Sequence, residues 1–223
     1  TRRDGFGSDL LKLDKTKTGG KSAARVMNAH PFTLGHQYLV ETAAAACDTL
    51  HLFVVSEDAS LVPFAVRKRL VAEGVAHLPN VILHDSGPYI ISNATFPSYF
   101  LKDEAAVISG HARLDLAVFT KIAKALNITA RYVGEEPTSQ VTGLYNQIMA
   151  EQLPRAGIDC IIVPRKEVNG KAISASTVRQ CLQTEEWAAL ETLLPQTSLD
   201  YFRSPEARII IDRIRKAENV VHY

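Results

Sequence analysis

The feature that most constrains the fold is a regular alternation of short apolar segments with helical patterns. Five segments are predicted to be strands, at 24–28, 50–56, 81–84, 129–134 and 159–164. Helical patterns follow at about 36–46, 64–76, 114–126 and 145–153, and further helices are expected from Ser176 onward. This alternation predicts an α/β fold, with a parallel sheet and helices on both faces. Ligands bind beyond the carboxyl ends of such strands, so the residues that follow each strand deserve examination.

The first residues differ in composition from the rest. Residues 1–22 are polar, basic and rich in Gly and Thr, as in Lys15–Lys21, which is typical of a linker. We interpret 1–22 as a linker or a remnant of an upstream region. Residues 23–223 are interpreted as one domain that ends in helices, and a hydrophobic content of 46% is enough for its core.

Charge and cysteine content exclude several classes of function. The formal net charge is +1, which does not favour a nucleic acid or a membrane surface as a partner. The three cysteines form no CxxC pair, as expected for reduced thiols in a cytoplasmic protein. The histidines have no spacing typical of a metal site, so no metal-binding residue is predicted.

The residues after the first strand suit an anion. In the segment Asn28–His36, Thr33 can cap a helix and Gly35 lets the backbone approach a ligand closely. His36 then lies in the first helical turn, where free N–H groups and the helix dipole favour a phosphate. The same residues could also form an ordinary capped helix start with a surface histidine.

A second cluster follows the fifth strand. After a hairpin-like Asn169-Gly170 comes the segment Ile173–Arg179, in which hydroxyl groups and an arginine share one turn: Ser174, Ser176, Thr177 and Arg179. Hydroxyl residues are common helix caps, so each of them alone is weak evidence. Two such helix starts after strands of one sheet predict a polyphosphate held between them. We therefore expect Thr33, His36, Gly134 and Ser174 to face one cleft.

These motifs resemble the paired signatures of the nucleotidyltransferase superfamily. Thr33-x-Gly35-His36 corresponds to its HxGH-type motif, and Ile173–Thr177 to its ISxS[ST]-type motif. Phe64-x-x-Arg67 and Val133-Gly134 also fall at characteristic positions. The resemblance implies a Rossmann-like five-stranded parallel sheet in the order 3-2-1-4-5.

A closer resemblance is to citrate lyase ligase, in its C-terminal catalytic part. It covers most of the chain from about Ala24 to Pro195 and is carried by Tyr89–Lys102, Arg131–Pro137 and Ile173–Arg179. The family usually has Asn where this chain has His30. An acetyltransferase-like domain lies upstream in the family, and we expect it to be absent from this chain.

The resemblance implies an AMP-forming acetate ligase that uses ATP and Mg²⁺. Acetate would attack the α-phosphate, pyrophosphate would leave, and the acetyl group would pass to the prosthetic-group thiol of the citrate lyase acyl carrier protein. His36 and Thr33 would be catalytic and contact the α- and β-phosphates. The remaining nucleotide-binding residues would be Asn28, His30, Gly35, Gly134, Ser174, Ser176, Thr177 and Arg179. The substrate-pocket candidates are Ser92, Thr95, Tyr99 and Lys102.

Two alternatives stay open at this point. One is an adenylyltransferase that acts on a phosphate ester such as phosphopantetheine. The other is a nucleotide-binding module without catalytic activity. The segment Tyr89–Lys102 favours the ligase, because it resembles that family and not the adenylyltransferases.

Overall fold

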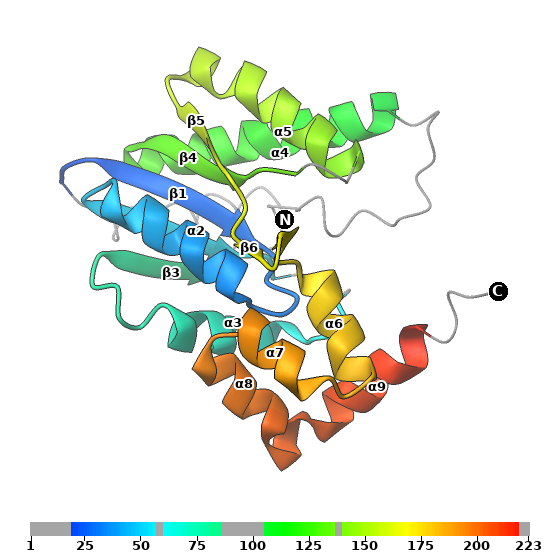
Figure 1. Ribbon diagram of the computed structural model, residues 1–223. Coiled ribbons are helices and arrows are strands. Elements are labelled where there is room, and N and C mark those ends of the chain that lie inside the picture. Colours follow the sequence, from blue (N-terminus) through cyan, green and yellow to red (C-terminus); the bar gives the residue numbers. More distant parts are fainter. Residues whose placement is uncertain (1–18, 57–59, 86–104, 137–139, 219–223) are drawn as a thin grey trace, which may run out of the picture. The chain divides into compact units, whose positions relative to one another are not determined.

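The computed structural model describes residues 19–56, 60–85, 105–136 and 140–218 (Figure 1). The chain divides into two compact units. Unit 1 is Thr1–Met27, Thr42–Ser56 and Asn80–Pro164, and unit 2 is Asn28–Glu41, Glu57–Pro79 and Arg165–Tyr223. The chain therefore passes from unit 1 into unit 2 directly after the first strand.

Unit 1 contains a five-stranded sheet in the order β3-β2-β1-β4-β5, which confirms the predicted order (Figure 1). The strands are β1 (Ser22–Met27), β2 (Thr49–Val54), β3 (Val81–Asp85), β4 (Ile128–Gly134) and β5 (Asp159–Val163). All neighbouring pairs are parallel. Ala24 of β1 lies opposite His51 of β2 and Arg131 of β4, and the register of β1 with β4 shifts between Ser22 and Ala23.

Burial along the strands follows their position in the sheet. Every residue of β2 is buried, as expected for an inner strand covered on both faces. The edge strands β3 and β5 are only partly buried, and Ile162 of β5 is exposed. The short apolar runs that predicted the inner strands therefore reflect burial on both faces.

The core on one face of the sheet is formed with α4 (Ala105–Leu126) and α5 (Gln140–Gln152). Both helices begin earlier than the predicted 114 and 145. In α4 the reason is that Ile108 and Ala112 extend the buried stripe of Leu116 and Phe119 by two more turns. The sequence pattern does not reveal this extension, because Ser109, Gly110 and His111 interrupt it.

Unit 1 also buries several polar side chains. Nδ1 of His51 lies 2.9 Å from Nε2 of His84, and the two rings stack. Burial lowers the pKa of both histidines, and that of His84 falls to about 4. On β4, the Arg131 guanidinium lies 4.5 Å from the centre of the Phe119 ring, a cation–π contact that partly offsets its burial.

Unit 2 contains α3 (Phe64–Gly74) and the C-terminal helices, and α2 (Leu34–Ala45) begins in it and ends in unit 1. The C-terminal elements are the hairpin β6–β7 (Glu167–Val168 and Lys171–Ala172), α6 (Ala175–Gln183), α7 (Trp187–Leu193), α8 (Gln196–Arg203), η5 (Pro205–Ala207) and α9 (Arg208–Glu218). Helix α3 packs against α8. These helices confirm the prediction for the region from Ser176 onward.

The turn before α2 is packed between α3 and α8. Phe32 is fully buried, and a Cβ atom added at Gly74 of α3 would lie 2.2 Å from Cε1 of its ring. The Ser198 hydroxyl on α8 donates a hydrogen bond of 3.3 Å to the Phe32 carbonyl oxygen. Helices far along the chain therefore fix the residues that precede α2.

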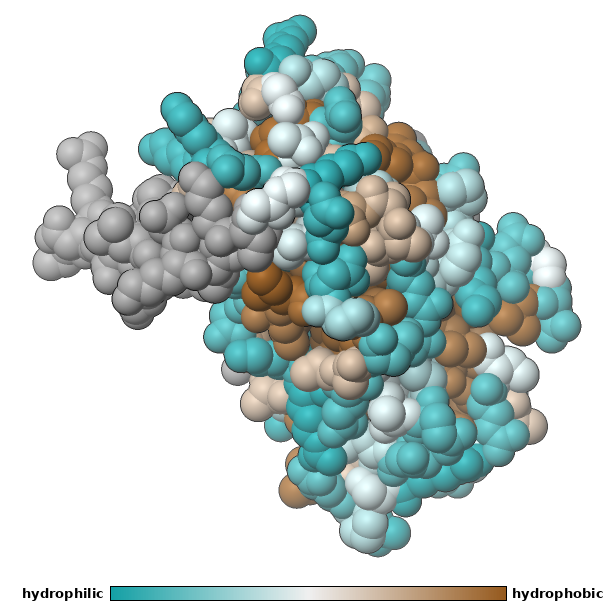
Figure 2. Space-filling view, turned by 90° about the vertical axis from the view of Figure 1, so that its left-hand side faces the viewer, coloured by the Kyte–Doolittle hydropathy of each residue, from teal (hydrophilic) through white to brown (hydrophobic). Residues whose placement is uncertain are grey.

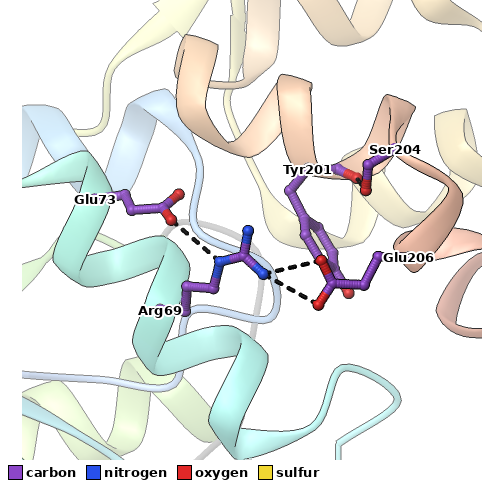
Figure 3. A network of polar contacts seen from close by, with 5 residues as sticks. All are labelled: Arg69, Glu73, Tyr201, Ser204 and Glu206. Atoms are coloured by element: carbon purple, nitrogen blue, oxygen red, sulfur yellow. Dashed lines mark hydrogen bonds and ion pairs between the residues drawn. The ribbon is translucent and has the colours of Figure 1, made fainter.

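A polar network links α3 to α8 and η5 at the surface of unit 2 (Figure 3). The Arg69 guanidinium bonds both carboxylate oxygens of Glu206 at 3.1 Å and one of Glu73 at 3.1 Å. It also lies 5.4 Å from the centre of the Tyr201 ring. Because these side chains are largely exposed, the network adds little stability to the contact of α3 with η5.

The surface carries both polar and apolar groups. On the face drawn in Figure 2, hydrophobic residues are interspersed with hydrophilic ones. Among the described residues, the exposed large hydrophobic side chains are Tyr38, Val107, Leu114, Ile162 and Ile209. No helix in the described part of the chain combines the length and the apolar character needed to cross a membrane.

Candidate functional site

The first predicted motif forms a capped helix start in unit 2. The Thr33 carbonyl accepts the first helical bond of α2, from the Gln37 N–H. The Thr33 hydroxyl accepts a bond of 3.3 Å from the His36 N–H, which satisfies one of the free donors of the first turn. The capping role predicted for Thr33 is confirmed.

Thr33 also orients the ring of His36. The Thr33 N–H donates to Nδ1 of His36 at 3.0 Å, and the Thr33 hydroxyl lies 2.9 Å from the same nitrogen. Because Nδ1 accepts, the neutral ring carries its proton on Nε2. The ring stacks on Phe32, with centroids 5.8 Å apart. His36 is thus held as a donor through Nε2.

A buried arginine holds the residue that follows β1. Arg67 is fully buried, and its Nη1 donates to the carbonyl oxygen of Asn28 at 2.9 Å and to its Oδ1 at 3.0 Å. Its Nε donates to the Val62 carbonyl at 3.0 Å. These bonds compensate for burying a guanidinium group. The pattern Phe64-x-x-Arg67 signalled this residue, but not its contacts.

His30 is held neutral within the same turn. Its Nε2 accepts a bond of 3.3 Å from the Val62 N–H, which requires an unprotonated nitrogen. Burial, together with the charges of Arg179 and Arg67, lowers the pKa of His30 to about 3. The preceding residue, Ala29, has a φ of 54°, a left-handed conformation that costs an L-residue roughly 1–2 kcal/mol.

The second predicted motif follows the hairpin β6–β7. Asn169 and Gly170 both have positive φ, at 53° and 76°, as a tight hairpin turn requires, so the predicted hairpin is confirmed. Ser174 then caps α6, because its hydroxyl accepts from the Thr177 N–H at 3.1 Å. Ser176 and Thr177 are exposed in the first turn.

The two motifs meet within unit 2. A Cβ atom added at Gly35 would lie 3.4 Å from both Cβ and the carbonyl oxygen of Ile173. Nη1 of Arg179 on α6 donates a bond of 2.7 Å to the His30 carbonyl oxygen. Neither α2 nor α6 has an acidic residue in its first turn. Two helix N-termini therefore lie near each other without a carboxylate of their own first turns to compete for an incoming anion.

The remaining predicted site residues do not belong to the described part of unit 2. Gly134 ends β4 in unit 1, where its carbonyl oxygen accepts a bond of 2.9 Å from Nδ2 of Asn146. A common cleft that includes Gly134 therefore stays a prediction. The substrate-pocket candidates lie outside the described residues: Ser92, Thr95, Tyr99 and Lys102.

The structure adds residues that the sequence did not single out for this site. Ser60 lies 3.4 Å from Nδ2 of Asn28, and Val62 bonds both His30 and Arg67. Nothing in the spacing of these residues indicates such contacts, which arise only when the chain folds. Among the described residues, no group of three or more His, Cys, Asp or Glu side chains could hold a metal.

Comparison with known proteins assigns the chain to a family. A family model described as the citrate lyase ligase C-terminal domain matches residues 22–202. The chain belongs to this family. The matched range includes both motifs and every described residue that contacts them above.

Relatives of the citrate lyase ligase family are similar over most of this chain. The [citrate [pro-3S]-lyase] ligase of Haemophilus influenzae is 44% identical over 191 residues, which is 83% of this chain and 57% of that protein. The protein of the same name from Klebsiella pneumoniae is 45% identical over 188 residues, or 82% of this chain and 55% of that protein. The chain thus spans little more than half the length of these relatives.

A solved structure extends the likeness to the fold. The bifunctional NMN adenylyltransferase/ADP ribose pyrophosphatase of Francisella tularensis matches with a TM-score of 0.53 and 14% identity, over 92% of this chain and 55% of that one. At this identity the likeness concerns the fold alone.

Proposed function

We propose that this chain activates acetate with ATP and transfers the acetyl group to a thiol. A carboxylate oxygen of acetate attacks the α-phosphorus of ATP, the bond to the β-phosphate oxygen breaks, and pyrophosphate leaves. The thiol of a CoA-like prosthetic group on the citrate lyase acyl carrier protein then attacks the acetyl carbon and releases AMP. Membership of the citrate lyase ligase family supports this reaction.

One observation carries the proposal, namely the meeting of the α2 and α6 helix starts in unit 2. Gly35 packs against Ile173, so the first turn of α2 lies near the start of α6. Hydroxyl groups of Ser174, Ser176 and Thr177 belong to the same region. This is the donor-rich, positively polarised environment that a triphosphate needs.

Each residue has a chemical task in the proposed reaction. His36 donates from Nε2 to the α-phosphate, where negative charge develops as pyrophosphate leaves. Thr33 keeps the ring in that tautomer through its N–H. Hydroxyl and backbone donors at the start of α6 hold the leaving pyrophosphate. ATP enters as its Mg²⁺ complex, because Mg²⁺ in such sites is bound largely by substrate phosphates.

No nucleophilic side chain of the protein is needed. Acetate itself attacks phosphorus, and the prosthetic-group thiol attacks the acetyl group, so the protein positions reactants and stabilises charge. The three cysteines agree with this, since burial raises the pKa of each thiol and so disfavours the reactive thiolate.

The proposal is tested by the exchange of labelled pyrophosphate into ATP. We expect acetate to stimulate this exchange, because formation of acetyl-adenylate is reversible until a thiol arrives. Phosphopantetheine should have no effect. Exchange driven by phosphopantetheine and indifferent to acetate would indicate an adenylyltransferase, and no exchange with the folded chain under either condition would indicate a binding module.

A further inference from the structure

Two guanidinium groups bond the backbone on both sides of Ala29. Arg67 donates to the carbonyl oxygen of Asn28 at 2.9 Å, and Arg179 donates to that of His30 at 2.7 Å. Arg67 comes from α3 and Arg179 from α6. The residue between the two carbonyls, Ala29, has a φ of 54° and is 1% exposed.

These bonds act on a conformation that the residue itself does not favour. An alanine in the left-handed region returns to negative φ unless its surroundings hold it. Charge-assisted hydrogen bonds are about twice as strong as neutral ones. Two of them, on the peptide groups before Ala29 and after His30, therefore suit the task of holding this turn. Burial is the main cause of the lowered pKa of His30, and the charges of Arg179 and Arg67 add to it, which agrees with two cations close to the turn.

The turn leads directly to the first motif. Three residues separate Ala29 from Thr33, which caps α2 and orients His36. Arg179 belongs to the second motif. A bond from Arg179 to His30 therefore couples the two motifs through the backbone, without a ligand between them.

We propose that Arg179 is a positioning residue, which acts on the candidate site by holding the His30 carbonyl and thereby the turn Asn28–His30. The sequence motif instead predicts a role for Arg179 in nucleotide binding. The effect on catalysis rests on the proposed function, whereas the effect on the turn does not.

The Val62 amide reports on the turn independently of activity. Its N–H donates to Nε2 of His30, so its exchange with solvent deuterium depends on where the His30 ring lies. In Arg179→Met we expect this exchange to become about tenfold faster, the loss that one charge-assisted bond implies. Ala29→Gly removes the penalty at positive φ, so the double variant Ala29→Gly/Arg179→Met should regain most of the protection.

The experiment compares the wild type, both single variants and the double variant by amide exchange of the full chain. Arg215→Met is the matched control, because Arg215 on α9 is paired with Glu185 at the surface of the same unit. If Arg179→Met does not fold, Arg179→Lys, which loses the guanidinium fork, is measured in its place. Unchanged protection of the Val62 amide in the Arg179 variant would overturn the proposal. So would an equal loss of this protection with and without Ala29→Gly.

Acetate-dependent exchange of pyrophosphate into ATP, measured on the same proteins, gives the catalytic consequence. We expect turnover to fall in Arg179→Met and to recover in the double variant. If Arg179 instead bound a phosphate of ATP, Ala29→Gly could not replace the lost contact. A loss of turnover in Arg179→Met that Ala29→Gly does not restore would therefore contradict the positioning role. If the wild type shows no exchange at all, the proposed function fails while the Val62 result still decides on the turn.

Discussion

Single residues at this site act mainly through the groups that orient them. Thr33 bonds His36 through both its N–H and its hydroxyl, and thereby selects the ring tautomer. Arg67 has no solvent exposure and bonds the backbone oxygens of Asn28 and Val62 and the amide oxygen of Asn28. Such orientation matters because a donor placed in advance needs no reorganisation when charge develops during the reaction.

Replacing His36 tests its role directly. In His36→Ala we expect turnover to fall about 10²–10³-fold, the usual loss for one preorganised donor. ATP affinity should weaken far less, because the helix N-termini and the hydroxyl groups of α6 remain. The measurement is turnover together with ATP affinity, with His77→Ala, an exposed histidine of the same unit, as the control. Near-normal turnover would show that His36 has no catalytic role and is only an ordinary residue of a capped helix.

The pH dependence of stability tests the environment of His30. Its pKa is about 3 in the folded chain, against 6.5 for a histidine in water, so between these values only the unfolded chain takes up the proton. Stability is therefore full above about pH 6.5 and is lost as the pH falls toward 3, by up to about 1.4 kcal/mol per pH unit. His84 and His51 act in the same direction, because their pKa values are also lowered.

The variant His30→Asn has no imidazole to take up a proton and should lose less stability on acidification. Urea unfolding at about pH 7, 5.5 and 4.5, which spans the window between the two pKa values, measures this difference. His111→Asn, on the exposed side of α4, is the matched control. The same steep acid dependence in His30→Asn as in the wild type would show that His30 is not held neutral by its surroundings.

Residue types alone predicted the cap at Thr33 and allowed one among the hydroxyl residues of the second motif, but they did not predict the two arginine contacts. Thr33 and Ser174 cap helices through bonds to residues three positions away, so local sequence contains the whole interaction. Arg179 bonds a residue 149 positions away, and Arg67 one 39 positions away. Contacts over such separations depend on the packing of α3 and α6, which no local pattern encodes.

At the scale of elements, the candidate site depends on how helices approach the turn before α2. Gly74 at the end of α3 allows this approach, because any side chain there would overlap the Phe32 ring. Ser198 of α8 bonds the same residue. The alternation of strands and helices predicted which elements exist, but starts such as that of α4 were set by burial in the core.

Two glycine substitutions in helices should have opposite effects. Gly74→Ala should destabilise the chain by about 1–3 kcal/mol, because its Cβ atom would lie 2.2 Å from Phe32 and force a shift in a packed site. Gly110→Ala in α4 meets nothing within 4 Å and should stabilise by about 0.5–1 kcal/mol through helix propensity. Thermal and urea unfolding of both variants checks this, and equal effects would contradict the packing of α3 on the turn.

At the scale of the whole molecule, the sheet and the candidate site belong to different units. The sheet with α4 and α5 forms unit 1, while both helix starts of the site and their buried arginine lie in unit 2. Strand order followed from the resemblance to the superfamily, and the five-stranded sheet confirms it. The acetate pocket stays a prediction, because its candidates in the segment Tyr89–Lys102 lie outside the described residues.

The central claim is that a carboxylate oxygen becomes bonded to the α-phosphorus of ATP. In the most direct measurement, the chain is incubated with Mg²⁺–ATP and with acetate that carries ¹⁸O in both oxygens. Hydroxylamine traps the acetyl group, and mass spectrometry measures the ¹⁸O content of the AMP. Attack of hydroxylamine on the acetyl carbon leaves the bridging oxygen on phosphorus, so we predict AMP with one ¹⁸O from acetate. AMP formed without ¹⁸O, or only in amounts independent of acetate, would contradict the proposed activation.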